Sequence, residues 1–129
     1  MGLIYFPPGV ASPVSGASGN LAADYSGLQS ITWSVNQNNI ALPTGTGFRI
    51  TPTTNIDWTG MVAAANNTFY LIYNAGTSNI KFKFNNANSA VGNRFFPFTG
   101  SDITLGDYAS VYIRYDSTLP GWHLVGLQH

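Results

Sequence analysis

Residues 69–84 read FYLIYNAGTSNIKFKF, in which two apolar segments flank a turn that is rich in Asn, Gly and Ser. In the second segment, two lysines separate three apolar residues, Ile80, Phe82 and Phe84. Successive side chains on a β-strand point to opposite faces of the sheet. The alternation therefore predicts a strand with one apolar face and one solvated face.

Similar alternation recurs along most of the chain, between turns that contain Gly, Pro or Asn. Short strands at this spacing are typical of a sandwich or a jelly roll and not of an α/β fold. No segment has the length and pattern of a helix. We therefore predict an all-β fold, an antiparallel and jelly-roll-like β-sandwich, with strands at residues 31–35, 40–42, 48–50, 56–62, 69–73, 80–84, 111–115 and 122–125.

Charged residues are scarce in this chain. They make up 8% of the 129 residues, whereas soluble domains usually contain about 25%. All five acidic residues are Asp, and the formal net charge is zero. Because a neutral surface resists self-association poorly, we expect other subunits to cover much of it.

The same composition argues against several classes of function. The five basic residues are scattered, whereas nucleic-acid binding needs a basic patch. The chain has no cysteine and only two histidines, His123 and His129, so we predict no metal site and no cofactor. No apolar run approaches the roughly 20 residues of a membrane span, so we predict no membrane partner either.

The first 27 residues differ from the rest in composition. They are rich in Pro and Gly, which exclude a helix and a central strand, but they also contain large apolar residues that solvated tails usually lack. We predict an extended N-terminal arm at residues 1–27, with a floppy tail as the alternative, and a β-sandwich domain at residues 28–129. The residues that we expect to make contacts through this arm are Ile4, Tyr5, Phe6, Pro7, Pro8 and Val10.

A series of motifs follows in a characteristic order between Ile56 and Val125. The motifs are Ile56-Asp57-Trp58-Thr59-Gly60-Met61, Phe69-Tyr70-Leu71-Ile72-Tyr73-Asn74-Ala75-Gly76, Ile80-Lys81-Phe82, Asn93-Arg94-Phe95, Asp102-Ile103-Thr104-Leu105, Tyr115-Asp116 and Trp122. This order resembles a β-sandwich module of bacteriophage structural proteins, which occurs in tail fibres and in head fibres or head decorations. The resemblance covers a little over half of the chain.

This resemblance implies a virion component that usually assembles as a trimer. The family has no shared catalytic residues, so none is carried over. The chain departs from the family pattern at Trp58, where the family usually has an aliphatic residue, and at His123, where it often has a basic one. These departures leave the predicted fold unchanged.

Several positions are expected to determine the fold. Asn74 and Gly76 suit a turn with left-handed backbone geometry, and Arg94 is expected to bridge to Asp116 or to backbone carbonyls. Trp122 has an indole N–H that needs an acceptor. The full set of predicted fold-determining residues is Trp33, Trp58, Phe69, Leu71, Phe82, Arg94, Ile113, Asp116 and Trp122.

Catalytic motifs are absent from the sequence. There is no Gly-x-Ser-x-Gly nucleophile elbow. Asp102 and Asp107 are the one carboxylate pair that we consider for glycoside cleavage, but both stand in turn contexts where Asp usually bonds its own backbone. We predict that the protein is not an enzyme.

Two functions remain, both in the virion. We expect a capsid decoration or cement protein that binds itself as a homotrimer and the major capsid protein, with the arm on the capsid or on a neighbouring subunit, after assembly in the host cytoplasm. The alternative is a tail-fibre module that binds host glycans. A fibre needs a long shaft before its head domain, whereas this sequence has only a short arm after Met1. The aromatic residues considered for glycan stacking are Tyr5, Tyr25, Trp58, Tyr108 and Tyr112.

Overall fold

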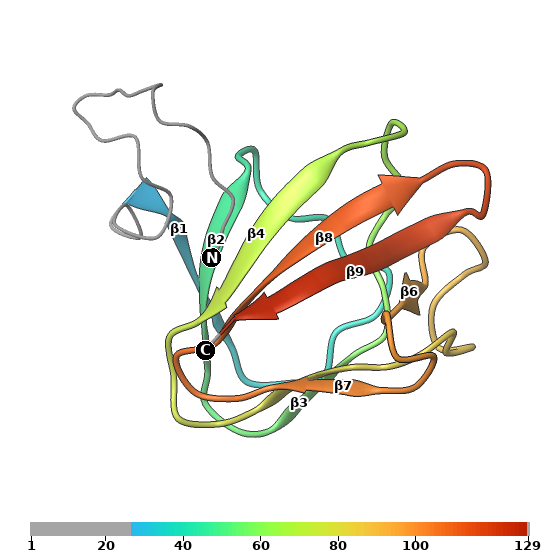
Figure 1. The fold of residues 1–129 in the computed structure, drawn as a ribbon. Helices are drawn as coiled ribbons and strands as arrows, with labels where there is room; N and C mark the ends of the chain where they lie inside the picture. The colour runs from blue at the N-terminus through green and yellow to red at the C-terminus, as the bar shows by residue number, and fades with distance from the viewer. Residues whose placement is uncertain (1–26, 129) are drawn as a thin grey trace.

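The computed structural model describes residues 27–128, with side chains described up to Gly126. Within this range the chain forms nine strands and no α-helix (Figure 1). The predicted arm contacts Ile4, Tyr5, Phe6, Pro7, Pro8 and Val10, together with Tyr25 and His129, lie outside the described residues. The strands are β1 (Gln29–Trp33), β2 (Gly47–Pro52), β3 (Ile56–Trp58), β4 (Phe69–Asn74), β5 (Ile80–Phe82), β6 (Phe95–Phe96), β7 (Ile103–Leu105), β8 (Ser110–Asp116) and β9 (Gly121–Gln128).

The strands form two sheets that enclose a shared core. One sheet has six strands in the order β1-β2-β4-β8-β9-β6, and the other has three in the order β3-β5-β7. Figure 1 shows the smaller sheet as a separate layer below the larger one. The protein is thus all-β with two sheets, an arrangement that is compatible with a β-sandwich. No described segment is a helix that is long and apolar enough to cross a membrane.

Aromatic rings from both sheets meet in the middle of the core. Trp58 is fully buried, and its ring centroid lies 4.7 Å from that of Trp33, 5.1 Å from Phe82 and 5.0 Å from Phe95. The indole N–H of Trp58 donates to Gly60 O at 3.1 Å. Edge-to-face and tilted ring contacts of this kind add to the free energy gained from burial alone. Trp58 therefore links the two sheets through ring contacts and carries no unsatisfied donor into the core.

The second core tryptophan, Trp122, also has the acceptor that its N–H needs. Its Nε1 donates to Met61 O at 3.2 Å, and its ring stacks on Tyr70 with centroids 5.4 Å apart. The side chain is almost fully buried. A buried indole N–H without an acceptor would cost stability, so this hydrogen bond makes the burial of Trp122 favourable.

Strand pairing is mixed, whereas the sequence predicted an antiparallel sandwich. The pairs β1–β2, β2–β4, β3–β5 and β6–β9 are parallel, and the pairs β4–β8, β5–β7 and β8–β9 are antiparallel. From β2 to β8, successive strands alternate between the two sheets. Parallel neighbouring strands need a crossover connection between them. For β2–β4 and for β3–β5, that connection contains the intervening strand, which belongs to the opposite sheet.

The inner faces of β5 and β8 are as predicted, whereas of the two β4 residues that were expected to determine the fold, Leu71 is buried and Phe69 is not. Phe82 and Ile113 are fully buried, whereas Phe69 is 48% exposed. In β4 the side chains that belong to or pack against the core are Ile72 and Tyr70. Because most residues of β4 are apolar or aromatic, alternation does not define its inner face. The expectation that Phe69 helps to determine the core was therefore wrong.

One predicted strand is replaced by an isolated bridge. Residues 40–42 contribute only the pairing of Ile40 with Met61. The segment beside β3 begins earlier, at Gln37, whose N–H donates to Asp57 O and whose carbonyl accepts from Thr59 N, both at 2.9 Å. The edge of the smaller sheet is thus covered by irregular chain.

Strands β6 and β7 lie outside the predicted set. They contain two and three residues, respectively. Alternation needs about four residues or more before it becomes a recognisable pattern. Strands as short as these are therefore found only from the pairing of the backbone.

The expected left-handed turn at Asn74 and Gly76 was also wrong. Neither residue has a positive φ. Asn74 is buried, its Nδ2 donates to Ser78 O at 2.8 Å and to Leu105 O at 2.9 Å, and its Oδ1 accepts from Gly76 N at 2.9 Å. A Cβ on Gly76 would lie 3.0 Å from Pro52 Cδ. These two residues therefore hold a loop by hydrogen bonding and close packing, not by left-handed geometry.

Candidate binding surface

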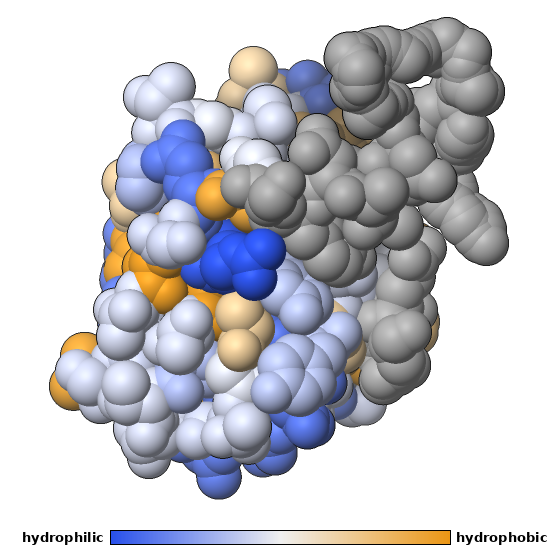
Figure 2. Space-filling view, turned by 90° about the vertical axis from the view of Figure 1, so that its left-hand side faces the viewer, coloured by the Kyte–Doolittle hydropathy of each residue, from blue (hydrophilic) through white to orange (hydrophobic). Residues whose placement is uncertain are grey.

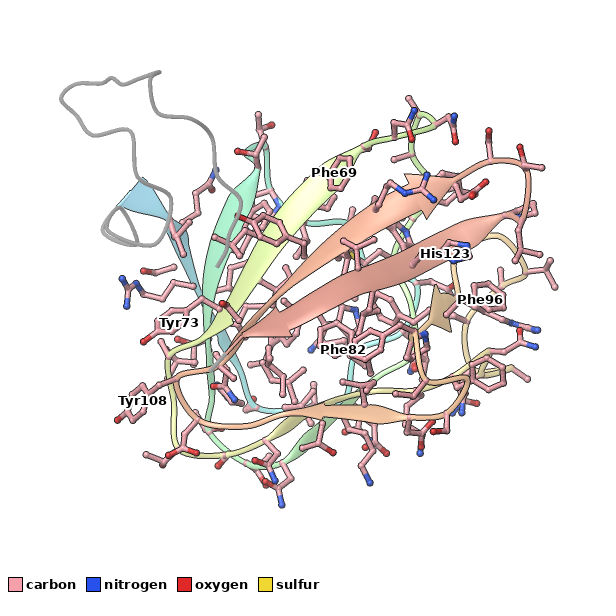
Figure 3. The ribbon with its side chains drawn as sticks, in the orientation of Figure 1. Phe69, Tyr73, Phe82, Phe96, Tyr108 and His123 are labelled. Atoms are coloured by element: carbon pink, nitrogen blue, oxygen red, sulfur yellow. The ribbon has the colours of Figure 1, made fainter. Side chains whose placement is uncertain are left out.

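The outer face of the six-stranded sheet is rich in aromatic and aliphatic side chains. Three such residues, Phe69, Leu71 and Tyr73, alternate along β4 and lie outside the core cluster. In β8, Tyr112 pairs with Leu71 and Arg114 pairs with Phe69, so their side chains lie on the same face. Figure 3 shows Phe69 and Tyr73 along β4 on this side of the sheet.

The apolar character of this face extends to its β9–β6 edge. Phe96 and His123 are paired across β6 and β9, and their rings stack with centroids 5.2 Å apart. Phe84 meets Phe96 edge-to-face at 6.1 Å. His123 Nε2 lies 3.1 Å from Leu119 O. Because a carbonyl oxygen only accepts, Nε2 carries the hydrogen in this contact.

The charged groups on this face are largely compensated. The Arg49 guanidinium carbon lies 5.3 Å from the centroid of the Tyr73 ring, a distance typical of a cation–π contact. Arg114 pairs with Asp116 at 3.1 Å and donates to Asn67 Oδ1 at 3.0 Å. The outer face of the six-stranded sheet therefore carries aromatic rings, together with charged groups that already have a partner.

Asp116 also orders the turn between β8 and β9. Its Oδ1 accepts from Thr118 N at 2.8 Å and from Leu119 N at 3.2 Å. The backbone donors, and then the hydrogen bond from Arg114, lower the pKa of Asp116 below its ordinary value because they stabilise the charged carboxylate. One of the two contacts expected for Arg94 was an ion pair with Asp116, and the structure places Arg114 there instead.

Arg94 makes the other contact that was expected for it, to a backbone carbonyl. Its Nε donates to Ser89 O at 2.9 Å, and its Nη1 donates to Asn85 Oδ1 at 3.3 Å. Ser89 Oγ in turn accepts from Asn39 N at 3.0 Å. Arg94 thus ties the loop before β6 together.

The outer face of the three-stranded sheet is different. Its strands direct Asp57, Lys81 and Thr104 outward, in one row across the sheet. Next to this row, Lys83 Nζ lies 3.0 Å from Asp102 Oδ2. Alternating charge of this kind is typical of a solvated face and discourages contact between strands of different molecules.

Asp102 is held by two donors. Its Oδ1 accepts from Phe84 N at 2.8 Å. This backbone hydrogen bond, and then the hydrogen bond from Lys83, lower the pKa of Asp102. The hydrogen bond to Asp102 raises the pKa of Lys83. Asp102 and Asp107 stand before and after β7, so the pair considered for glycoside cleavage is separated by that strand.

A tyrosine with strained backbone geometry stands at the rim between the two sheets. Tyr108 has φ 61° and is 58% exposed, in the turn between β7 and β8. Its N–H donates to Asn74 O at 2.8 Å. A bulky residue rarely adopts a left-handed φ, and such outliers cluster at functional sites. The local pattern Gly-Asp-Tyr indicated a turn but not this geometry.

Tyr108 and Tyr73 project from the same end of the molecule (Figure 3). Figure 2 views this end and shows mostly pale and blue side chains, with small apolar patches among them. Of the other residues considered for glycan stacking, Trp58 is fully buried and has no exposed ring face to offer. Tyr112 is half-buried on the outer face of β8.

No cluster of three or more His, Asp or Glu side chains that suits a metal ion occurs within residues 27–128. A hollow of about 330 Å³ lies beside β1 and β2. It is lined by Gly27, Leu28, Gln29, Gly45, Thr46, Gly47 and Leu71.

Comparisons with known proteins give no relative for this chain. No protein-family model matches it, no curated protein is significantly similar to it, and no solved structure matches it.

Proposed function

We propose that this protein decorates the head of a bacteriophage. In this proposal three copies form a homotrimer that binds the major capsid protein on the outer shell and cements neighbouring subunits. The site of action is the virion, after assembly in the host cytoplasm. No catalytic step, cofactor, nucleic acid or membrane is part of the proposal.

The observation that carries the proposal is the contrast between the two outer faces. One presents Phe69, at 48% exposed, and Val125, at 50% exposed. The other presents Asp57, Lys81 and Thr104. Exposed apolar faces mark interaction sites, whereas a charged face keeps an assembled particle soluble. A protein that must bind on one side and face solvent on the other needs this asymmetry.

The assignment of the fold as jelly-roll-like, with an extended arm, is part of the same proposal. We take the two sheets to be a jelly-roll-like variant, with the extended arm at residues 1–27 as the element that reaches a partner. The sequence resemblance to virion modules supports this assignment, as do the apolar residues of the arm. The fold-determining roles of Trp33, Trp122 and the other predicted residues are part of it.

Cementing follows from linked equilibria. A trimer that binds the assembled shell and not free capsid subunits shifts the equilibrium toward the shell. Several modest contacts in one trimer act together, because the first contact raises the effective concentration of the next. Firm capture therefore needs no single strong contact.

The test is to mix the purified protein with undecorated heads and to sediment the mixture. We expect it to co-sediment with the heads, and we expect the free protein to have about three times the 13.8 kDa monomer mass. Heads that carry it should resist heat or low salt better than bare heads. A protein that stays in the supernatant at all concentrations, or that is monomeric throughout, contradicts the proposal.

One observation favours the alternative of a tail-fibre module that binds host glycans. Tyr108 combines exposure with a strained backbone, and strained residues of this kind cluster at active sites and ligand-binding sites. If this alternative holds, Tyr108→Ser should abolish binding to host cells. Phe98→Ser is the matched control, because Phe98 is also well exposed but lies in the loop after β6. Equal loss in both variants would remove the argument for Tyr108.

A further inference from the structure

Four strands stand at the edges of the two sheets, β1 and β6 in the larger sheet and β3 and β7 in the smaller one. Phe84 forms a bridge beside β6, and Gln37 forms one beside β3. Strand β7 has three residues, whereas β1 has five. Within residues 27–128, β1 is therefore the longest strand that has a neighbouring strand on one side only (Figure 1).

Strand β1 also lacks the features that usually keep sheet edges apart. Its sequence, QSITW, contains no charged residue and no proline. Its pairing with β2 runs without a register shift, so no bulge turns the edge away. Native proteins usually protect a sheet edge with charged side chains, proline, a bulge or a very short strand. An edge without them is suited to pairing with a further strand.

The hydrogen bonds to β2 determine which backbone groups of β1 remain for such a strand. Trp33 O accepts from Thr53 N at 2.9 Å, so Trp33 directs its backbone groups toward the side of β2. Because these directions alternate along a parallel strand, Ile31 does the same. Ser30 and Thr32 therefore direct their N–H and C=O groups away from β2. Both residues are exposed.

We propose that β1 pairs with β1 of a second copy of this chain, antiparallel and about a two-fold axis at Ile31. In this register Ser30 of one copy lies opposite Thr32 of the other. The two residues exchange both of their N–H···O bonds, as in any hydrogen-bonded antiparallel pair. The two-fold axis repeats the exchange on the other side of Ile31. The outward backbone groups of β1 are thus complementary to themselves, as a two-fold contact requires.

The side chains of β1 fit the same pairing. On the outer face, the hydroxyl groups of Ser30 and Thr32 lie opposite each other, and cross-strand Ser and Thr pairs stabilise a sheet. On the inner face, Ile31 packs against the core but is only half-buried. Its exposed part would be buried against Ile31 of the second copy. Because β1 carries no charge, the pairing also brings no like charges together.

This contact is separate from the proposed trimer, because a two-fold contact cannot close a ring of three. It joins a copy in one trimer to a copy in the next. One short strand from each copy buries far less than the roughly 1,000 Å² of a stable interface. The pairing is therefore weak in dilute solution, and it is favoured where copies are held close together, as on a shell.

The test uses disulfide trapping in the full chain, which contains no native cysteine. In the proposed register the two Ile31 Cα atoms lie about 4.5 Å apart, which a disulfide can bridge. The test variant is therefore Ile31→Cys. The control is Val35→Cys, because Val35 is 66% exposed but lies beyond the end of β1, away from the axis. Both are oxidised mildly at high protein concentration and separated on a denaturing gel without reductant.

We expect about tenfold more covalent dimer from Ile31→Cys than from Val35→Cys, although Val35 is the more exposed residue. Equal amounts overturn the inference. The same result is expected if another segment of the chain, or an unrelated partner, occupies the edge of β1.

A second pair of variants tests the backbone hydrogen bonds directly. Thr32→Pro, added to Ile31→Cys, removes an outward N–H that makes no bond to β2, and proline is tolerated at such edge positions. Thr32→Val keeps the N–H and the shape of the side chain. We expect the proline to lower the yield of dimer about tenfold and the valine to leave it nearly unchanged. Equal yields in the two variants overturn the proposed pairing.

The mass of the unmodified protein in dilute solution and its binding to heads test the proposed function separately, because neither depends on β1. A trimer that binds heads but gives no excess of linked Ile31→Cys chains overturns the β1 pairing alone. A monomer that does not bind heads overturns the proposed function and leaves the trapping result to decide the pairing.

Discussion

The two sheets share one core, but their outer faces differ in character, since one is rich in aromatic and aliphatic side chains and the other carries charged and polar ones. On the six-stranded sheet, β4 and β8 direct Phe69 and Tyr112 outward. On the three-stranded sheet, the row from β3 to β7 carries Asp57, Lys81 and Thr104. Both outer faces could be solvated in an isolated domain, so stability alone gives no reason for the difference. The difference supports the proposal that one face makes contacts and the other faces solvent.

The largest expected effect tests the strand phase on which this comparison depends. Phe82 is fully buried between the sheets, and Lys83 follows it on the outer side. Phe82→Ala should lower the free energy of unfolding by about 3–5 kcal/mol, through lost burial and the cavity left behind. Lys83→Ala should change it far less. Denaturant unfolding of both variants is the measurement, and equal losses would show that the faces of β5 are assigned wrongly.

The second prediction compares exposed apolar residues on and off the proposed contact face. Phe69→Ser should weaken association of the subunits by about 1–2 kcal/mol per contact, because a half-buried ring loses its burial against the partner. Val91→Ser is the control, since Val91 is 79% exposed in the loop before β6. Sedimentation over a range of protein concentrations measures the association of subunits in both variants. A similar loss in the Val91 variant would break the comparison between the faces.

The third prediction concerns the rim at the β7–β8 turn. Asn tolerates the left-handed φ of Tyr108 better than an aromatic residue does. Tyr108→Asn should therefore stabilise the fold by about 1 kcal/mol. Tyr73→Asn, in the strand β4, should destabilise it instead. Denaturation midpoints at unchanged slope would measure both changes. A loss of stability in the Tyr108 variant would show that the ring itself holds the turn.

The smallest expected effect concerns the charged face. The folded-state pKa of Asp102 is lowered, so its contribution to stability is present above the ordinary Asp pKa of 3.8 and is lost as pH falls through the folded value. Because the pair with Lys83 is exposed and screened by solvent, the effect should be close to the limit of measurement. Stability curves of wild type and Asp102→Asn should differ slightly at pH ~6 and approach each other as pH falls through the lowered pKa of Asp102. A constant difference across that range would contradict a role for the charge.

Sequence patterns predicted strands well where one face of the strand was polar. The lysines around β5 define which side Phe82 takes, and the alternation in β8 does the same for Ile113. In β4 both faces carry large apolar residues, so the pattern predicted the strand but placed Phe69 on the wrong side. The sequence pattern therefore fails to predict which face of a strand is buried when the outer face is also apolar and half-buried.

The candidate surface depended on contacts between distant segments. Tyr108 and Tyr112 were expected from the sequence as candidate surface aromatics, whereas nothing in the sequence indicated the Phe96–His123 stack, which joins β6 to β9. Arg94 contacts Ser89 and Asn85 and not Asp116. Arg114 lies two residues before Asp116 on β8 and so on the same face of the strand, and this spacing indicates the ion pair better than the distant Arg94 does.

The sequence by itself determined that this protein is an all-β chain with few charges and no net charge, because alternation and composition act locally on each strand. Only the tertiary structure decided the mixed pairing and the contrast between the outer faces. Alternation of successive strands between two sheets brings β2 beside β4 and β3 beside β5. That arrangement gathers apolar side chains on one side and charges on the other, and it is set by long-range packing of the core.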